Sequence, residues 1–553
     1  MAEKRRGEKV MPTFEASFKD FEKLVGKKLP KNKEKLWRKL LLVKSEVEEL
    51  DIKNDIIKFE PADSNRPDMW HVEGLARALK GAMGISKGIP DYEVIASRDE
   101  IIVDKSIKKI RPFIACAVIK GMKFTDFLIK QLMQLQLKVD GSYGRKRAKS
   151  SIGSYNYEMI KFPVKYRAVG KEDAEFVPLG FSEEMTPVEI LKLHPKGVEY
   201  GRILENFSKA PLLIDAEGKI LSMPPIINSN DVGKITEETK AVLVEVTGTN
   251  IDAVMGSLSI VVSALADRGG KIYSLKVRNG KKTLITPNIT PKTITVSKKS
   301  IEKRIGLSWT DKELKDLLSR ARFDVQKITK EEIIVKIPFY RLDIMHEFDV
   351  IEDLAVMFGF ENIPSQPINL PTHGGLMESS AHISKVRDLL IGMGCQEVMN
   401  YYRCDKEALF NQDCVEIENP MGLTMNVLRN ELMPVLLRWM AKNTHNSYPQ
   451  KIFEVGKTFI KNKEEVSEDN YLSMLSAHLD ADFTEIKQSA EWLLNSLGKK
   501  YELKAKDYMQ YIPGRSAAII VADKEIGHFG ELSPKLILEN GMENPLVGLE
   551  IRL

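Results

Sequence analysis

The chain has 553 residues, enough for roughly three to five domains at about 100–200 residues each. Hydrophobic residues make up 43% of it and charged residues 29%, which fits an ordinary soluble protein, and it contains no run of about 18 apolar residues that would cross a membrane. The net charge of +5 is small for this length, so it permits a nucleic-acid partner without arguing for one.

The first ten residues, MAEKRRGEKV, are mostly polar and charged. They lack the apolar segment of a secretory signal, so residues 1–10 are predicted to be a disordered extension, with ordered sequence from about Met11. The four cysteines are too few and too scattered for a disulfide framework, and no Cys/His pair has zinc-like spacing. These features indicate a reducing compartment and a cytoplasmic location.

Two distant segments repeat the same features in the same order. In the first segment, a helical stretch follows Leu24-Val25-Gly26 and a second one follows Arg66-Pro67-Asp68-Met69. In the second segment, the corresponding motifs are Arg304-Ile305-Gly306 and Arg341-Leu342-Asp343-Ile344, and each also precedes a helical stretch. Each segment is predicted as helix, strand, Arg-x-Asp turn and helix, ending at a glycine. Five matching features in one order favour a duplication over chance similarity between amphipathic helices. The sequence therefore predicts two copies of one small α+β module.

Between the two copies, strand-like runs alternate with helical ones, and the last part of the chain does the same. In the middle, strands are predicted at 113–119 and 241–246, and helices at 125–137, 185–192 and 251–265. The segment from Ser222 to Asn228 is rich in turn residues and is predicted as a loop. In the last part, a helix is predicted at 379–393 and strands at 451–459 and 517–521. Both parts are predicted to be α+β domains.

An acidic segment opens the last helix of the second copy. At 100° per residue the apolar residues of this helix fall on one face, and Asp349, Glu352 and Asp353 fall on the other. One interpretation is a solvated acidic helix start, because carboxylates favour a helix N-terminus. The other is a Mg²⁺ site in which Asp343, on the preceding turn, supplies a fourth oxygen ligand.

A basic loop follows the first middle helix. It carries the four cations Arg145, Lys146, Arg147 and Lys149 and one tyrosine between glycines. Such a loop is suited to gripping a phosphate backbone, but a solvated surface loop has the same composition.

One acid stands in an otherwise apolar predicted strand. Glu245 alternates with Val244 and Val246, and Thr247 lies on the same side of the strand as Glu245. A lone acid of this kind is usually a surface residue, and strand periodicity alone does not decide its role. The sequence has no nucleophile elbow, P-loop or dinucleotide-binding fingerprint, so it offers no self-contained catalytic constellation.

From Met11 to Leu553 the sequence resembles the family of phenylalanyl-tRNA synthetase β subunits of the archaeal and eukaryotic type. Each matching motif is moderately specific, and their occurrence in one order is highly specific. The motifs are Asn65-Arg-Pro-Asp-Met-Trp-His-Val-Glu-Gly-Leu-Ala76, Arg147-Ala-Lys-Ser-Ser-Ile-Gly153, Phe176-Val-Pro-Leu179, Ser222-Met-Pro-Pro-Ile-Ile-Asn228, Arg341-x-Asp-Ile with Asp349-x-x-Glu-Asp353, Glu418-Asn-Pro420, Leu428-Arg-Asn-Glu-Leu-Met-Pro434 and Phe453-Glu-Val-Gly456.

The resemblance implies an α+β multidomain chain in which two related modules flank an editing domain and a degenerate class II synthetase-like antiparallel-sheet domain follows. The implied parts are the modules 11–95 and 285–370, the editing domain 96–284 and the synthetase-like domain 371–553. It also implies an (αβ)₂ heterotetramer that charges tRNA(Phe) with phenylalanine. In that assembly the α subunit binds ATP, phenylalanine and Mg²⁺, and the β subunit contacts tRNA(Phe) and hydrolyses Tyr-tRNA(Phe).

Two departures from a working class II core imply that the last domain is an inactive interface. Where an arginine that holds ATP phosphate would follow Phe459, this chain has Ile460. The ending Gly548-Leu-Glu-Ile-Arg-Leu553 also lacks the glycines of the last class II motif. Without those groups the charge on a transferring adenylate would go unstabilised.

The resemblance also assigns site residues. It implies an editing pocket built by Ser222, Glu245 and Thr247, with Leu213 as an apolar wall. The family more often has aspartate at the position of Glu245. It further implies that Arg145 and Arg147 of the basic loop contact tRNA. It also implies a Mg²⁺ site shared with the α subunit, with the ligands Asp343, Asp349, Glu352 and Asp353.

The alternative is a stand-alone tRNA-binding protein or trans-acting deacylase on a degenerate synthetase scaffold. The presence of all four family parts argues against it, because a free-standing editing protein would need only the middle one.

Overall fold

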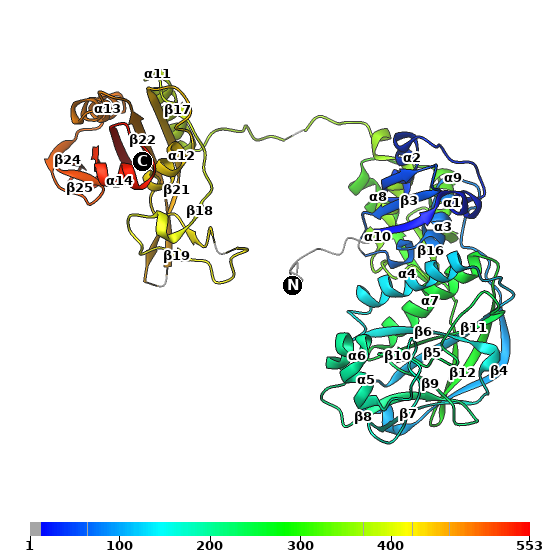
Figure 1. Ribbon diagram of the computed structural model, residues 1–553. Helices are drawn as coiled ribbons and strands as arrows, with labels where there is room; N and C mark the ends of the chain where they lie inside the picture. Colours follow the sequence, from blue (N-terminus) through cyan, green and yellow to red (C-terminus); the bar gives the residue numbers. More distant parts are fainter. Residues whose placement is uncertain (1–12, 64, 369, 423, 464) are drawn as a thin grey trace. The chain divides into compact units, whose positions relative to one another are not determined.

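The computed structural model describes residues 13–63, 65–368, 370–422, 424–463 and 465–553. The extension predicted at residues 1–10 lies outside them. The chain forms two compact units, Met1–Gln366 and Pro367–Leu553 (Figure 1). Among the described residues no helix is long and apolar enough to span a membrane. The several separate sheets, each packed with helices, confirm the coarse prediction of an α+β multidomain chain.

The first and second modules have the same order of elements: strand, two helices, two strands and a helix. In the first these are β1(Phe14–Ser17), α1(Phe18–Val25), α2(Lys33–Leu40), β2(Ser45–Asp51), β3(Ile56–Pro61) and α3(Val72–Ala82). In the second they are β14(Lys292–Ser297), α8(Lys298–Ile305), α9(Asp311–Arg320), β15(Asp324–Ile328), β16(Glu332–Ile337) and α10(Glu347–Phe358). The sheets are also ordered alike, β1-β3-β2 and β14-β16-β15. The predicted pattern lacked the opening strand and one of the two later strands, because these short strands gain their stability from pairing across the sheet.

The likeness between the modules extends to the helix ends. Ser17 caps α1 and Ser297 caps α8, and each helix stops at a left-handed glycine, Gly26 at φ 77° and Gly306 at φ 79°. Glycine has no Cβ and adopts this conformation without strain. A sheet irregularity also falls in the corresponding strand of each module, in β2 and in β15.

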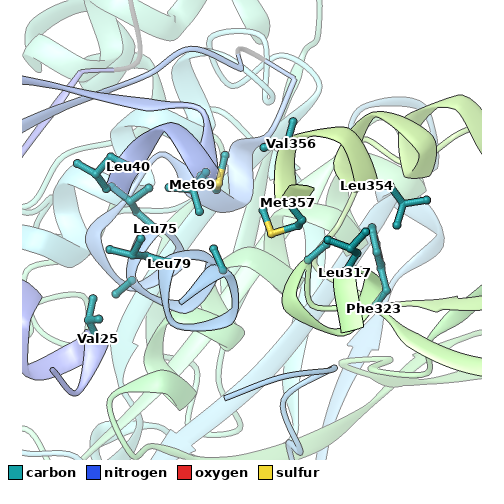
Figure 2. Packing of buried hydrophobic residues seen from close by; sticks show 14 of the residues in the cluster. Val25, Leu40, Met69, Leu75, Leu79, Leu317, Phe323, Leu354, Val356 and Met357 are labelled. Atoms are coloured by element: carbon teal, nitrogen blue, oxygen red, sulfur yellow. The ribbon is translucent and has the colours of Figure 1, made fainter. Parts of the chain in front are cut away.

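The two modules share one hydrophobic core although the middle domain separates them in sequence. Buried side chains of α3 and of α9 and α10 belong to a single cluster; Figure 2 shows, among others, Leu75 and Leu79 from the first module and Leu317, Val356 and Met357 from the second. Lys44 also forms an ion pair with Glu352 across the boundary, with 2.5 Å between Nζ and Oε1. Neither module therefore completes its core alone.

The middle domain is a ten-stranded mixed sheet with the order β10-β9-β8-β7-β4-β12-β5-β11-β6 and with β13 paired to β12. Its strands are β4(Val94–Val103), β5(Phe113–Lys120), β6(Ser150–Asn156), β7(Val164–Gly170), β8(Lys209–Ile214), β9(Ile220–Met223), β10(Ile227–Asn228), β11(Ala241–Gly248), β12(Lys271–Asn279) and β13(Lys282–Thr286). Its helices are α4(Asp126–Gly141), α5(Pro187–Leu193), α6(Pro195–Tyr200) and α7(Ile251–Asp267). Helices α4 and α7 pack on one face of the sheet. The loop predicted at 222–228 contains the end of β9 and the short strand β10.

This sheet curls until its two ends meet. At the β10 end, the side-chain amide of Asn228 donates to the Ser154 carbonyl of β6 at 3.1 Å. The backbone N–H of Asn156 in β6 donates to the Val232 carbonyl at 2.9 Å. Because β10 and β6 are the terminal strands of the order, these bonds enclose the face that lies away from α4 and α7. The side chains of β6, β9 and β11 on that face converge in its interior.

The second unit is built on a seven-stranded sheet with the order β17-β21-β22-β26-β25-β24-β23, antiparallel except for the pair β17–β21. Its strands are β17(Gln396–Glu397), β21(Gln450–Asn462), β22(Glu465–Ala477), β23(Glu502–Ala505), β24(Tyr511–Val521), β25(Lys524–Leu532) and β26(Leu546–Arg552). Helices α11(Glu378–Gly392) and α13(Phe483–Ser496) cover one face, and α12(Met433–Ala441) and α14(Pro534–Glu539) cover the other. A three-stranded sheet also belongs to this unit: β18(Arg403–Cys404), β20(Val427–Leu428) and β19(Val415–Glu416).

Candidate functional site

Three polar side chains from three strands meet inside the curled sheet of the middle domain. The Tyr155 hydroxyl of β6 lies 2.8 Å from Oγ of Ser222 on β9 and 2.8 Å from Oε2 of Glu245 on β11. All three are buried, with exposed fractions of 0%, 1% and 2%. The site thus forms from residues far apart in sequence, and Ser222 and Glu245, predicted together, do lie together.

A glycine makes room for this cluster. Gly153 lies directly opposite Glu245 in the pairing of β6 with β11. A Cβ at Gly153 would collide with the Glu245 carboxylate and with the Tyr155 hydroxyl. The missing side chain therefore lets both groups fold over the strand and touch.

Glu245 is the unusual group of the cluster. Burial raises its pKa to about 7, although the hydrogen bond from Tyr155 and the charge of Arg111 both act to lower it. Its Oε2 accepts the hydrogen bond from Tyr155, but among the described residues its Oε1 has no hydrogen-bond partner. A buried polar oxygen without a partner is costly, so it marks a place where a ligand or a water belongs.

Glu245 lines a pocket of about 20 Å³, which has room for about one water molecule or one hydroxyl group. Its walls include Tyr155, Ser222 and Glu245, and the segment from Pro224 to Asn228. A second cavity of about 390 Å³ lies beside it, between α4 and β10, and shares Arg147 and part of that segment with the pocket.

The two other predicted editing residues lie behind the pocket and do not line it. The Thr247 hydroxyl is on the same side of β11 as Glu245, as predicted, but it accepts a hydrogen bond from Nε of the buried Arg111 at 2.9 Å. Arg111 also donates to Ser151 at 3.0 Å. Leu213 is 1% exposed and packs in the core beside Ser222, its pairing partner across β8 and β9.

Sequence reasoning missed Tyr155 and Arg111. Tyr155 lies two residues after Gly153, so strand alternation places it on the face of Gly153, and that signal was available. No pattern marks Arg111 as buried, because a buried arginine depends on partners supplied by distant strands.

The basic loop after α4 divides into two kinds of residue. Arg145, Lys146 and Arg147 all have positive φ, at 50°, 52° and 67°. Arg145 and Lys146 are exposed. Arg147 instead donates to the carbonyls of Pro225 and Ile226 at 3.1 and 2.9 Å, so it ties the loop to the pocket wall.

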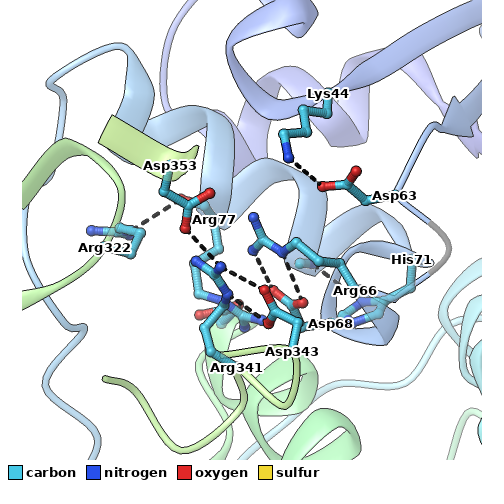
Figure 3. Close-up of polar contacts among 12 residues, drawn as sticks. Lys44, Asp63, Arg66, Asp68, His71, Arg77, Arg322, Arg341, Asp343 and Asp353 are labelled. Atoms are coloured by element: carbon cyan, nitrogen blue, oxygen red, sulfur yellow. Dashed lines mark hydrogen bonds and ion pairs between the residues drawn. The ribbon is translucent and has the colours of Figure 1, made fainter. Parts of the chain in front are cut away.

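The acidic segment of the second module is held by other partners (Figure 3). Arg341 donates to both oxygens of Asp343 at 2.9 and 2.7 Å and to Asp353 at 2.7 Å. Asp349 accepts the backbone N–H groups of Met345 and His346 at 2.7 and 2.8 Å and caps α10. Glu352 is the residue paired with Lys44.

Asp353 does not share the exposed face predicted for it. It is 7% exposed and points to Arg341, because α10 is covered by the first module as well as by its own sheet. Arg66 and Asp68 form the equivalent fork in the first module, at 2.7 Å. Figure 3 shows the two forks close together at the boundary between the modules.

As placed here the four acids do not fit one Mg²⁺ ion, which needs several oxygens at about 2.0–2.1 Å. Within the described residues no group of three or more His, Cys, Asp or Glu side chains is arranged to hold a metal. Burial would raise the pKa of Asp343, but the Arg341 charge lowers it to about 2. Asp343 and Asp353 are thus partners of an arginine in this conformation.

In the second unit, two buried acids on the sheet face under α12 have protein partners. Glu550 of β26 accepts the backbone N–H groups of Leu432 and Met433 at 3.0 and 2.6 Å, at the start of α12. The fully buried Arg429 donates to Glu454 of β21 at 2.6 Å. Burial raises the pKa of Glu550 to about 8.

Comparison with known proteins agrees with the motifs. Residues 363–553 match the family model described as the phenylalanyl tRNA synthetase beta chain CLM domain, and residues 294–360 match the tRNA synthetase B5 domain. Phenylalanine–tRNA ligase beta subunits of Pyrococcus furiosus and Thermococcus onnurineus are 40% and 39% identical to the chain. The alignments cover 98% of this chain in both cases, and 99% and 98% of the two relatives.

A solved structure agrees as well. The crystal structure of an N-terminal fragment of the phenylalanyl-tRNA synthetase beta subunit from Pyrococcus horikoshii is 40% identical, with a TM-score of 0.61. The match covers 63% of this chain and 99% of that fragment. The resemblance predicted from the motifs is thereby confirmed, and the chain belongs to the family of phenylalanine–tRNA ligase β subunits.

Proposed function

We propose that the middle domain, residues 96–284, removes tyrosine from mischarged tRNA(Phe). The observation that carries this proposal is the buried carboxylate of Glu245, which lines a pocket with room for one hydroxyl group and whose Oε1 has no hydrogen-bond partner among the described residues. Ser222 and Tyr155 complete the polar surroundings of that space.

The need for such a site follows from energetics. Tyrosine differs from phenylalanine by one hydroxyl, and an apolar synthetic pocket rejects an added hydroxyl by only about 100-fold. A second site does better if it binds the hydroxyl itself. Tyrosine would pair with Glu245 Oε1, whereas phenylalanine would leave that buried oxygen unpaired at a penalty of about 1–3 kcal/mol.

The reaction is ester hydrolysis. A water oxygen adds to the carbonyl carbon that joins tyrosine to the terminal ribose, the bond from that carbon to the ribose oxygen breaks, and the ribose oxygen takes a proton from the water. Among the described residues the side-chain hydrogen bond of Ser222 is to the Tyr155 hydroxyl and to no base. We therefore propose direct attack by water, assisted by the ribose of the tRNA, without a covalent intermediate. Ser222, in the wall of the same small pocket as Glu245, contributes to binding the tyrosyl hydroxyl, and Thr247, held by Arg111, supports the strand.

The approach of the tRNA is proposed along the basic loop. Arg145 and Lys146 are exposed and positively charged, as phosphate contacts require. The cavity of about 390 Å³ next to the pocket offers space for the 3′ end beside Glu245. Arg147 contributes by fixing the pocket wall.

We also propose that the chain works in the cytoplasm in an (αβ)₂ heterotetramer with a catalytic α subunit, which holds the ATP, phenylalanine and Mg²⁺ used in charging. Ile460, at the place of an ATP-binding arginine, supports this division, as does the sheet face filled by Glu550 and α12. The Mg²⁺ site at Asp343, Asp349, Glu352 and Asp353 stays a prediction, and occupying it would require the contacts of Arg341 to open.

Hydrolysis of Tyr-tRNA(Phe) by the reconstituted enzyme tests the editing function. Glu245→Gln keeps the size of the side chain but offers the tyrosyl hydroxyl a weaker acceptor, so we expect at least a tenfold loss of deacylation. Glu550→Gln is the matched control, since Glu550 is also buried but lies in the other unit. Unchanged deacylation by the Glu245 variant would place the editing pocket elsewhere.

A further inference from the structure

Tyr155 stands between the two groups that the proposed reaction uses. Its hydroxyl is 2.8 Å from both Ser222 Oγ and Glu245 Oε2, and its side chain is fully buried. Nothing in the deacylation reaction itself requires a phenol at this place, and the family motifs did not point to it.

The directions of the two hydrogen bonds follow from the number of protons. A tyrosine hydroxyl has one proton, and an ionised carboxylate can only accept. With Glu245 ionised, Tyr155 therefore donates to Glu245 Oε2, and Ser222 donates to the Tyr155 oxygen. The serine proton is then engaged by Tyr155, and among the described residues no group donates to the serine oxygen, which is free to accept a hydrogen bond.

The same contact decides how many carboxylate oxygens face the ligand. One oxygen of Glu245 accepts the Tyr155 hydrogen bond, and among the described residues Oε1 is left without a partner, in a residue that lines a space for one hydroxyl group. A carboxylate free to rotate would present two acceptors in no fixed direction. A tied one presents a single acceptor in one place, which is what recognition of a single hydroxyl requires.

We infer that Tyr155 is a positioning residue of the editing site, which fixes Glu245 and orients Ser222 for recognition of the tyrosyl hydroxyl. The inference rests on the proposed function. Its distinct content is that discrimination between tyrosine and phenylalanine depends on a hydroxyl group that touches neither substrate.

Tyr155→Phe removes only this hydroxyl, and Tyr166→Phe is the matched control. Tyr166 is also fully buried in the same domain, but its hydroxyl donates to the Arg111 carbonyl at 2.9 Å and does not touch Glu245. Steady-state deacylation of Tyr-tRNA(Phe) and Phe-tRNA(Phe) should show at least a tenfold fall in the kcat/KM ratio for Tyr155→Phe and little change for Tyr166→Phe.

The pH profile gives a second readout that a purely structural role would not move. The Tyr155 hydrogen bond lowers the pKa of Glu245, so its loss raises that pKa further above about 7. The other titratable groups that interact with Glu245 are Arg111, Asp140, Cys116 and Tyr166, which the substitution leaves in place. The acid limb of deacylation, where the ionised carboxylate is required, should therefore shift to higher pH.

The outcomes separate the inference from the proposed function. If Glu245→Gln loses deacylation but Tyr155→Phe keeps both the substrate ratio and the pH profile of the wild type, Tyr155 is only a core residue and the inference is wrong. If Glu245→Gln keeps deacylation, the proposed function itself fails.

Should Tyr155→Phe unfold, Tyr155→3-fluorotyrosine keeps the ring and hydroxyl. Because its phenol is a stronger donor, the acid limb should then move to lower pH. An unmoved limb would contradict the inference.

Discussion

The pocket of the middle domain and the boundary between the two modules both bury carboxylates, and they treat them in opposite ways. At the boundary, Asp343 and Asp353 share Arg341, and that charge lowers the pKa of Asp343 to about 2. At the pocket, one oxygen of Glu245 has no partner within the described part of the chain, and burial raises the pKa of Glu245 to about 7. Paired acids hold parts of the chain together, whereas an unpaired one is available to a ligand. Burial is common to both sites, so the difference in pKa between these acids comes from their partners.

The largest expected effect is at the module boundary. Arg341→Met would leave Asp343 and Asp353 buried without their cation, so the free energy of unfolding should fall by about 3–5 kcal/mol. Denaturant unfolding of the full chain measures this. Arg278→Met is the control, since Arg278 pairs with Glu100 while half exposed and should lose at most about 1 kcal/mol. Equal losses of unfolding free energy in the two variants would show that the buried acids at the boundary do not depend on Arg341.

A smaller effect concerns pH. The pKa of Glu245 is raised from 4.5 to about 7 on folding, so the stability linked to it is fully present below about pH 4.5 and is lost as the pH rises to about 7. At about 1.4 kcal/mol per pKa unit, the loss is about 3.5 kcal/mol. Glu245→Gln should remove this dependence, which unfolding between pH 5 and 8 would show.

Asp343 should show the opposite sign. Its pKa is lowered from 3.8 to about 2 on folding, so the stability linked to it is present above pH 3.8 and is lost as the pH falls toward 2. In Asp343→Asn the free energy of unfolding should therefore change less than in the wild type across that acid range. A parallel fall in both proteins would mean that the Arg341 pair does not protect the carboxylate.

The smallest expected effect is that of Mg²⁺ on the isolated chain. Because the four acids have protein partners, millimolar Mg²⁺ should change the free energy of unfolding by less than about 0.5 kcal/mol. A larger stabilisation that disappears in Asp349→Asn and in Asp353→Asn, but persists in the control Asp469→Asn, would establish the metal site. These acids would then bind a ligand, as is proposed for Glu245.

The sequence was informative where periodicity is local. Alternation in β11 places Glu245 and Thr247 on one side, and the repeated Arg-x-Asp turns mark both modules. Periodicity failed where a helix is covered twice. It put Asp353 on the outer face of α10, and the first module turns that face into an interior.

Strand alternation places Tyr155 on the side of Gly153, but neither the partners of its hydroxyl nor the burial of Arg111 follows from local periodicity. Their roles come from the way the sheet curls until β6 approaches β10, which depends on contacts between residues far apart in sequence. Strand patterns state which side a residue faces, but not which distant strands share that side.

The shared core of the two modules has a consequence for synthesis. The first module ends at Ala82 and its partner strands begin only at Lys292, with the whole middle domain made in between. At about 5–20 residues per second, the ribosome needs roughly 10–40 seconds to bridge that interval. Throughout it, the apolar side of α3 that later meets α9 is exposed to other nascent chains and to chaperones. During synthesis the first module therefore exposes an apolar surface that is covered only when the second module of the same chain has been made.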